Sequence, residues 1–129
     1  MKKEITSRKD IIQLVDAFYE KIKKDEMLGY IFNDIAKVNW DKHLPTMYDF
    51  WENTLFFTGT YSGNPVQQHA NLNQIMPITK AHFDHWNKLF VETVDTNFEG
   101  EKAELAKQRA LSISIVLQMK IAQAIKPEQ

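Results

Sequence analysis

The stretch SRKDIIQLVDAFYEKIKK, residues 7–24, decides the fold class of this chain. Its apolar residues recur at steps of three and four positions with charged residues between them, which is the period of one face of an α-helix. Ser7 stands where a helix-capping residue would, and Asp10 three places later completes a variant of the capping box. The stretch therefore predicts an amphipathic helix with Tyr19 on its buried side.

The next segments are predicted to form a short element and then a second long helix. Gly29 interrupts the apolar pattern of residues 25–35, which favours a short helix or turn laid against the core. A helix is predicted over about residues 41–57, with Asp41 as its N-cap. Pro45 would then fall in the first turn, where backbone N–H groups have no partner within the helix.

The second half of the chain begins with a loop and ends with two long helices. The stretch TGTYSGNP, residues 58–65, holds two glycines and a proline and is predicted to be a loop. Residues 66–77 allow at most a turn or two of helix before Pro77. Helices are then predicted over residues 79–97 and 101–126. The apolar residues of the last helix spread so widely around it that we expect it to be covered on more than one side.

The class is all-α, because no segment alternates apolar and polar residues over a useful length. A chain of 129 residues is one domain's worth, and we expect residues 1–129 to form a single domain with one core. The long loop and the broken middle are unusual for an up-and-down bundle, whose connections are normally short. We therefore expect something other than helix contacts to fill the middle.

Composition excludes several classes of protein and partner. With 43% hydrophobic, 12% aromatic and 26% charged residues, the chain is far too apolar to be disordered. A net charge of −1 provides no field to gather nucleic acid or an anionic membrane, so neither is an expected partner. The absence of cysteine removes thiolate metal sites and thioether-tethered cofactors. No signal peptide or apolar run of roughly 20 residues occurs, and we expect a cytoplasmic protein.

Histidines are the main candidates for chemistry, because no phosphate loop, HExxH, GxSxG or paired-carboxylate signature is present. His82 and His85 lie one helical turn apart, but no third ligand accompanies them, so a solvated face is the preferred interpretation. His69 follows the loop, which is a common placement for a metal ligand. His43 opens an apolar helix face. Taken alone, each of the four is more readily an ordinary surface or half-buried residue.

Tyr19 and Trp86 are the buried hydrogen-bond donors that the helical pattern predicts. Tyr19 lies on the buried side of the first helix, and Trp86 is in line with Phe83 and Phe90 on the helix over residues 79–97. Buried Tyr and Trp side chains normally find a partner for their O–H and N–H groups. Either each reaches a backbone carbonyl, which periodicity alone favours, or both donate into one shared cavity.

Several segments together resemble the truncated hemoglobins, and most closely their third group. The segment AFYEKIKKDEMLGYIFND places Tyr19 and Phe32 as that family places its distal tyrosine and the phenylalanine beside the heme. The segment HLPTMYDFWENTLF has His43, Met47 and Trp51 at the spacing of the family's distal-side residues.

The resemblance continues through the second half of the chain. YSGNP and the following QHANL bring His69 to the position of the proximal iron ligand, and HFDHWNKLF brings Trp86 to that of the distal tryptophan. The match covers roughly residues 8–120. The Gly-Gly motifs usual in the first and second groups are absent, which fits the third.

The resemblance implies a globin-like two-over-two helical sandwich that holds heme b, the protoporphyrin IX iron complex, without a covalent link. It implies His69 as the metal ligand. The distal side would then be formed by Tyr19, His43, Met47 and Trp86. Contacts with the heme are implied for Phe32, Met47, Trp51, Tyr61, His69 and Trp86.

The resemblance also implies a function: reversible binding of oxygen, nitric oxide and carbon monoxide. Tyr19 and Trp86 would donate hydrogen bonds to the ligand, and His43 would act as a gate at the mouth of the site. Peroxidase-like or nitric-oxide-dioxygenase-like turnover would require an electron-donating reductase, and the sequence leaves carriage and turnover open. A metal-free, small α-helical binding or interaction module with an apolar cavity is the alternative from another class.

Overall fold

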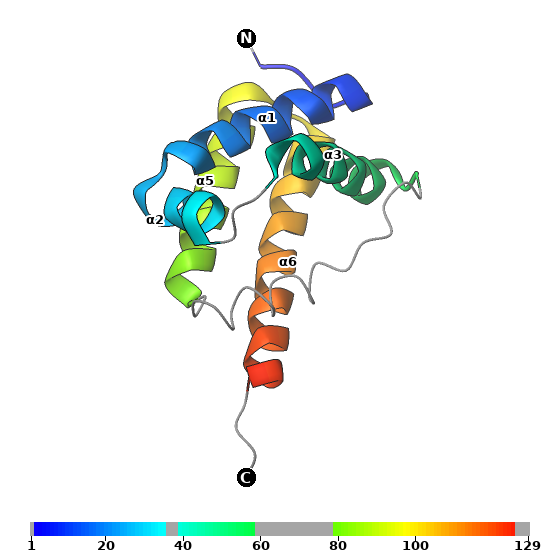
Figure 1. Cartoon of the computed structure of the whole chain (residues 1–129). Coiled ribbons are helices and arrows are strands. Elements are labelled where there is room, and N and C mark those ends of the chain that lie inside the picture. The colour runs from blue at the N-terminus through cyan, green and yellow to red at the C-terminus, as the bar shows by residue number, and fades with distance from the viewer. Residues whose placement is uncertain (1, 36–38, 59–78, 126–129) are drawn as a thin grey trace.

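The computed structural model of the chain is helical and describes residues 2–35, 39–58 and 79–125 (Figure 1). Within these ranges the all-α prediction is confirmed, because pairing between extended segments is limited to one isolated bridge of Lys3 with Phe98. No described helix combines the length and apolar character needed to cross a membrane. The elements are α1 (Arg8–Lys24), α2 (Glu26–Tyr30), the π-helical turn η1 (Ile31–Ile35), α3 (Trp40–Phe56), α5 (Lys80–Asn97) and α6 (Glu101–Ile125).

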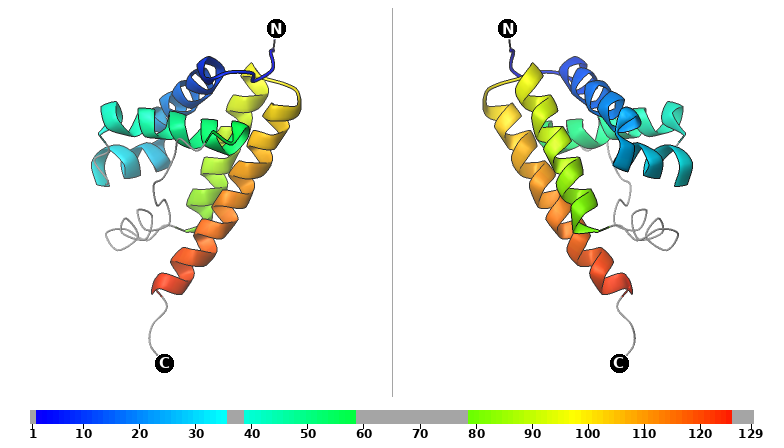
Figure 2. Two further views of the ribbon diagram at one scale, coloured as in Figure 1. Left: turned by 90° about the vertical axis from the view of Figure 1, so that its right-hand side faces the viewer. Right: turned by 90° about the vertical axis from the view of Figure 1, so that its left-hand side faces the viewer.

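Two pairs of helices make up the fold. The long helices α5 and α6 run side by side in opposite directions, joined by a tight turn (Figure 2). Helices α1 and α3 lie across one end of this pair and contact each other (Figure 1). α1 also packs on α5, and α3 on α6, so the two layers share one core. This is the two-over-two sandwich that the sequence predicts.

The amphipathic helix α1 is confirmed, but its N-terminus is capped differently from the prediction. Ser7 is the N-cap residue, yet its side chain makes no capping hydrogen bond. Asp10 reaches one residue further and accepts hydrogen bonds from the backbone N–H of Thr6 at 2.9 Å and from its hydroxyl at 3.1 Å. Asp10 also pairs with Lys3 at 3.0 Å. The carboxylate of Asp10 thus accepts both donors of Thr6, one residue before the predicted partner Ser7.

The short helix predicted around Gly29 is confirmed as α2, which packs tightly against the end of α1. A Cβ atom on Gly29 would lie 2.7 Å from the carbonyl oxygen of Lys23, closer than real Cβ atoms approach a backbone. The two helix ends can meet here only because glycine has no side chain. Asp25 caps α2 by accepting the backbone N–H of Leu28 at 2.9 Å.

Helix α3 begins earlier than predicted, and Pro45 lies deeper in it. The N-cap is Asn39 instead of Asp41, so Pro45 is the sixth helical residue and lies beyond the first turn. Its missing N–H removes the backbone hydrogen bond that would end on the carbonyl of Asp41. The earlier start has a tertiary cause: the ring of Trp40, the first helical residue, packs on Phe32 and so draws this turn into the fold.

The predicted boundaries of the two long helices are close to the observed ones, and α6 packs against two other helices but keeps part of its apolar surface exposed. Thr79 is the N-cap of α5, and Gly100, with φ of 98°, forms the turn before α6. Along α6, Leu117 is buried, whereas Leu111 and Met119 are 49% and 58% exposed. α6 contacts α3 and α5, and no other described helix covers its outer face.

The core is centred on stacked aromatic rings from both layers. Phe90 of α5 is fully buried and stacks on Trp51 of α3 at 4.8 Å between ring centroids, with 16° between the ring planes. Phe90 also meets the ring of Trp86 at 5.8 Å between centroids, with 7° between the ring planes. Phe18 of α1 stands edge-on to Phe90 at 5.1 Å. These contacts fix the relative position of α1, α3 and α5, the helices that carry the candidate site.

Candidate functional site

Three of the predicted site residues, each from a different element, meet in one aromatic cluster. The ring of Tyr19 on α1 lies 5.1 Å from the imidazole of His43 on α3, with the two planes at 86°. Phe32 on η1 lies 6.0 Å from Tyr19 and 6.4 Å from His43. The short packing distance between α1 and α2, together with the crossing of α1 and α3, brings these side chains to one place.

Trp40 completes this cluster, and sequence reasoning missed it. Its indole stacks on Phe32 at 5.9 Å and 18°, and lies 5.5 Å from Tyr19 and 5.7 Å from His43. We call these four residues, Tyr19, Phe32, Trp40 and His43, the distal cluster. Trp40 was overlooked because it precedes the residue that was predicted to cap the helix. Its spacing of three residues from His43, which places both on one helix face, is the signal that would have found it.

The hydroxyl of Tyr19 is held in its protonated, hydrogen-donating form. Tyr19 is 5% exposed and lies among the buried residues of α1. Burial raises the pKa of Tyr19, because a phenolate would lose its hydration in this apolar surrounding. Tyr19 therefore supplies a neutral O–H group at the edge of the core.

Trp86 and Trp51 differ in how deeply their side chains are buried. Trp86 on α5 is half-buried and stands edge-on to Phe18 at 5.4 Å, and Phe18 in turn contacts Tyr19 at 5.0 Å. Trp51 on α3 is 3% exposed and lies within the core. Met47, one turn after His43, is half-buried and packs against the same core. The two other predicted site residues, Tyr61 and His69, lie outside the described residues.

His85 makes a specific tertiary contact instead of lying on a solvated face. Its Nε2 atom lies 2.6 Å from Oδ1 of Asp25, the residue that caps α2. Burial would raise the pKa of Asp25, but the backbone N–H of Leu28 and the imidazole of His85 favour its carboxylate, and the net shift is downward. This contact thus connects α5, at the residue before Trp86, to the start of α2, the helix that precedes Phe32 on η1.

His82 is used locally and does not join His85 in a metal site. Its Nδ1 accepts the backbone N–H of Thr79 at 2.9 Å, as the far half of a capping box. Across the described ranges, no group of three or more His, Asp and Glu residues is arranged to hold a metal ion.

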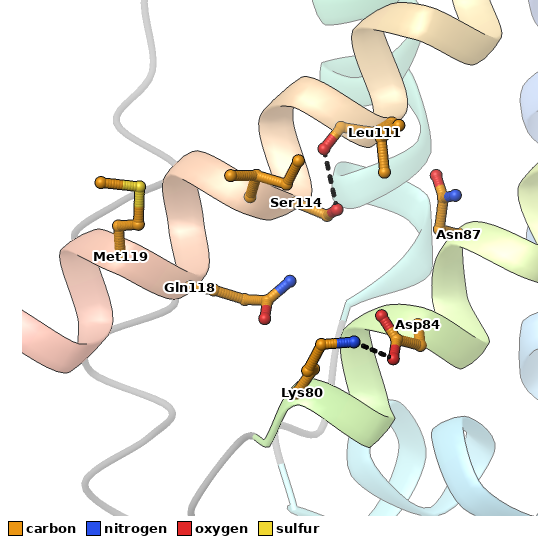
Figure 3. Close-up of a pocket in the computed structure, with 8 residues that line it drawn as sticks. Lys80, Asp84, Asn87, Leu111, Ser114, Gln118 and Met119 are labelled. Atoms are coloured by element: carbon orange, nitrogen blue, oxygen red, sulfur yellow. Dashed lines mark hydrogen bonds and ion pairs between the residues drawn. The ribbon is translucent and has the colours of Figure 1, made fainter.

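A concave region away from the distal cluster, which we call the outer groove, lies between α5 and α6 (Figure 3). It has a volume of about 450 Å³. An exposed ion pair of Lys80 with Asp84, 2.7 Å long, stands on its α5 side. None of the predicted site residues that the structure describes lines this groove. Its principal lining residues are Lys80, Asp84, Asn87, Leu111, Ile115 and Met119.

The distal cluster is bordered by apolar side chains that the described residues cover only in part. They pack against the core on one side and are half-exposed on the other. A partly covered wall of aromatic and aliphatic groups suits a flat apolar ligand, because binding would remove the remaining apolar area from water. The half-buried residues that pack against this core include Leu44, Met47, Phe50, Trp86 and Leu89.

Comparisons with known proteins identify the family. A family model described as bacterial-like globin matches residues 3–121. The chain is 33% identical over 117 residues to the group 3 truncated hemoglobin ctb of Campylobacter jejuni, which covers 88% of this chain and 90% of that protein. A crystal structure of group III truncated hemoglobin from Campylobacter jejuni superposes with a TM-score of 0.81 at 32% identity, over 94% of this chain and 95% of that chain. The chain therefore belongs to the bacterial-like globins and, within them, to the group III truncated hemoglobins.

Proposed function

We propose that this protein holds heme b through His69 and binds oxygen, nitric oxide and carbon monoxide beside the distal cluster. Heme-based ligand binding is general in the truncated globins. The observation that carries the finer proposal is the meeting of Tyr19 with His43 at 5.1 Å, from two helices that are far apart in the sequence. The roles of His69 as proximal ligand and of Tyr61 as a heme contact rest on the resemblance in sequence.

The residues of the structure fit a heme group. The half-buried apolar wall around the distal cluster offers contacts for the faces and edges of a porphyrin. The chain has no cysteine, so the cofactor would be held by one histidine and by apolar packing. When bound, heme supplies an iron with one open position for a small ligand. The residues proposed to hold it are Phe32, Met47, Trp51, Tyr61, His69 and Trp86.

Tyr19 and Trp86 are the proposed hydrogen-bond donors to the diatomic ligand. The hydroxyl of Tyr19 is protonated at neutral pH, and burial raises its pKa further above the ordinary tyrosine value. The indole of Trp86 carries an N–H group at the partly exposed side of the core. A hydrogen bond contributes about 1 kcal/mol to such binding, which corresponds to roughly a fivefold change in affinity. Two donors acting together would slow the release of oxygen considerably. Met47 supplies apolar contact, and His43 acts as the gate.

The same donor-rich pocket suits turnover as well as carriage. Hydrogen bonds from Tyr19 and Trp86 would polarise the ligand, which favours nitric-oxide-dioxygenase-like or peroxidase-like chemistry when a reductase supplies electrons. The rate of oxygen dissociation separates the two uses. Slow release supports chemistry or sensing, whereas fast release supports carriage.

Hemin titration of the purified protein tests the proposal. We expect a Soret band at one heme per chain, and we expect the His69→Ala variant to lose stable heme retention because the iron loses its protein ligand. His82→Ala is the matched control, since His82 serves only the cap of α5, and it should retain heme. A parent protein that stays colourless with added hemin would instead support the metal-free apolar binding module.

A further inference from the structure

We propose that Trp40 is a further residue of the ligand site: it closes the distal cluster on its outer side and holds the imidazole of His43 in place. The inference rests on the proposed heme function, because Trp40 acts through His43, the proposed gate. Trp40 is therefore a positioning residue: it limits the movement of the His43 imidazole, the proposed gate.

Of the three aromatic rings beside the imidazole of His43, Tyr19 and Trp40 are nearer than Phe32. Tyr19 meets it edge-on at 86°, and Trp40 meets it edge-on at 83° from another direction. Interiors packed at this density leave no room for a ring to turn unless a neighbour moves. Tyr19 is buried within α1, so it belongs to the rigid side of this enclosure. Trp40 is half-buried at the first residue of α3, where a helix has the fewest backbone hydrogen bonds.

Trp40 also makes exposed contacts with Asn33 and Lys23. Its Nε1 donates a hydrogen bond to Oδ1 of Asn33 at 3.3 Å, and Nδ2 of Asn33 donates to the backbone oxygen of Lys23 at 3.4 Å. The ammonium group of Lys23 lies 4.7 Å from the centroid of the indole ring. These hydrogen bonds are exposed and near the upper limit of length, so they are weak and reversible. Together they join the end of α1, η1 and the start of α3.

The inner face of Trp40 makes the stronger contact. Its indole is stacked on Phe32, the residue proposed to lie against the heme, with 18° between the planes. One side chain thus touches the proposed heme contact, the proposed donor Tyr19 and the proposed gate His43. A displacement of Trp40 would open space beside all three, and the entry of a small ligand would become faster.

Ligand entry in variants of Trp40 provides the test. Flash photolysis of the carbon-monoxide complex should show roughly two- to tenfold faster association for Trp40→Leu, the range that one edge-on ring contact can supply. Trp40→Phe keeps a ring against His43 and should stay close to the parent. Asn33→Ala removes the two hydrogen bonds that Asn33 makes with Trp40 and Lys23 but keeps the indole ring, so it should give a smaller acceleration. It also provides the test if Trp40→Leu does not fold.

A double-variant cycle shows whether Trp40 acts through His43. In a His43→Ala background the gate is already open, so Trp40→Leu should produce no further acceleration. An equal acceleration in both backgrounds, or none in either, overturns the proposal. Tyr30→Leu is the control, because Tyr30 is an aromatic residue at the neighbouring end of α2 and is 51% exposed. It should leave association unchanged.

A second readout does not depend on ligand kinetics. The nuclear Overhauser effect between the ring protons of His43 and Tyr19, recorded by NMR on the protein as purified under carbon monoxide, should weaken in Trp40→Leu and stay unchanged in Tyr30→Leu, because it reports the distance between these two rings. Weakening in a protein without a Soret band would support the positioning role and refute the heme proposal. A Soret band with an unchanged Overhauser effect would refute the positioning role and support the heme proposal.

Discussion

Helix α5 borders two regions that differ in kind, the distal cluster with its neighbour Trp86 and the outer groove with Lys80 and Asp84. In the first, aromatic side chains from α1, η1 and α3 converge within 5.1 to 6.4 Å of one another. In the second, aliphatic side chains of α6 stay about half-exposed beside an exposed ion pair. The comparison indicates that apolar residues alone do not form a site such as the one proposed here. Side chains from several elements must also converge on one place.

The electrostatic contacts of the two regions differ in the same way. The hydrogen-bonded contact of Asp25 with His85 joins two elements and is largely shielded, with side chains 17% and 30% exposed. The ion pair of Lys80 with Asp84 lies within one helix, with side chains 77% and 59% exposed. Solvent screens exposed pairs strongly, so we expect only the first pair to contribute to stability.

The largest expected effect is a loss of stability on the cluster side. Phe90→Ala removes a fully buried ring that stacks on both Trp51 and Trp86, and should lower the free energy of unfolding by about 3 to 5 kcal/mol. Leu111→Ala in the outer groove should change it by about 0.5 kcal/mol or less. Urea unfolding of both variants saturated with hemin measures the two values. Similar losses would break the comparison.

The next effect concerns oxygen release and the hydroxyl of Tyr19. Tyr19→Phe keeps the ring packing but removes the proposed donor, so oxygen dissociation should become roughly five- to tenfold faster by stopped-flow mixing. Tyr48→Phe is the matched control. The hydroxyl of Tyr48 on α3 donates a hydrogen bond to Oδ1 of Asp16 on α1 at 2.5 Å. Burial together with that carboxylate raises the pKa of Tyr48 to about 12. An unchanged rate in Tyr19→Phe would refute the donor assignment.

The smallest effect is the pH dependence of stability that arises from Asp25. Because the pKa of Asp25 is lowered in the folded state, its carboxylate stabilises the fold above the unfolded-state pKa of about 3.9, and this contribution is lost as the pH falls through the folded-state pKa. Asp25→Asn should therefore cost about 1 kcal/mol at neutral pH and progressively less near pH 3.

The matched control for Asp25→Asn is Asp84→Asn in the outer groove. Its exposed ion pair with Lys80 should leave urea unfolding unchanged at both pH values. If Asp84→Asn proved as costly as Asp25→Asn, the distinction between a shielded pair between elements and an exposed pair within one helix would be lost.

Local signals in the sequence predicted most of the fold. The helical period of residues 7–24 identified α1, and Thr79 and Gly100 marked the ends of long helices because capping and left-handed turns depend on nearby residues only. The prediction was wrong at the start of α3. There the packing of Trp40 on Phe32 outweighed the capping preference of Asp41, and such packing depends on a partner that no local pattern names.

By itself the sequence determined the helical class, the approximate helix ends and, through its resemblance to group III truncated hemoglobins, the residues to examine. Only the tertiary structure decided which of them meet. Among the described residues it brought Tyr19, Phe32 and His43 together, added Trp40 to them, and placed α3 and α5 against α6. The physical reason is that helical periodicity says which residues share a face, whereas contact and burial depend on which other element lies against that face.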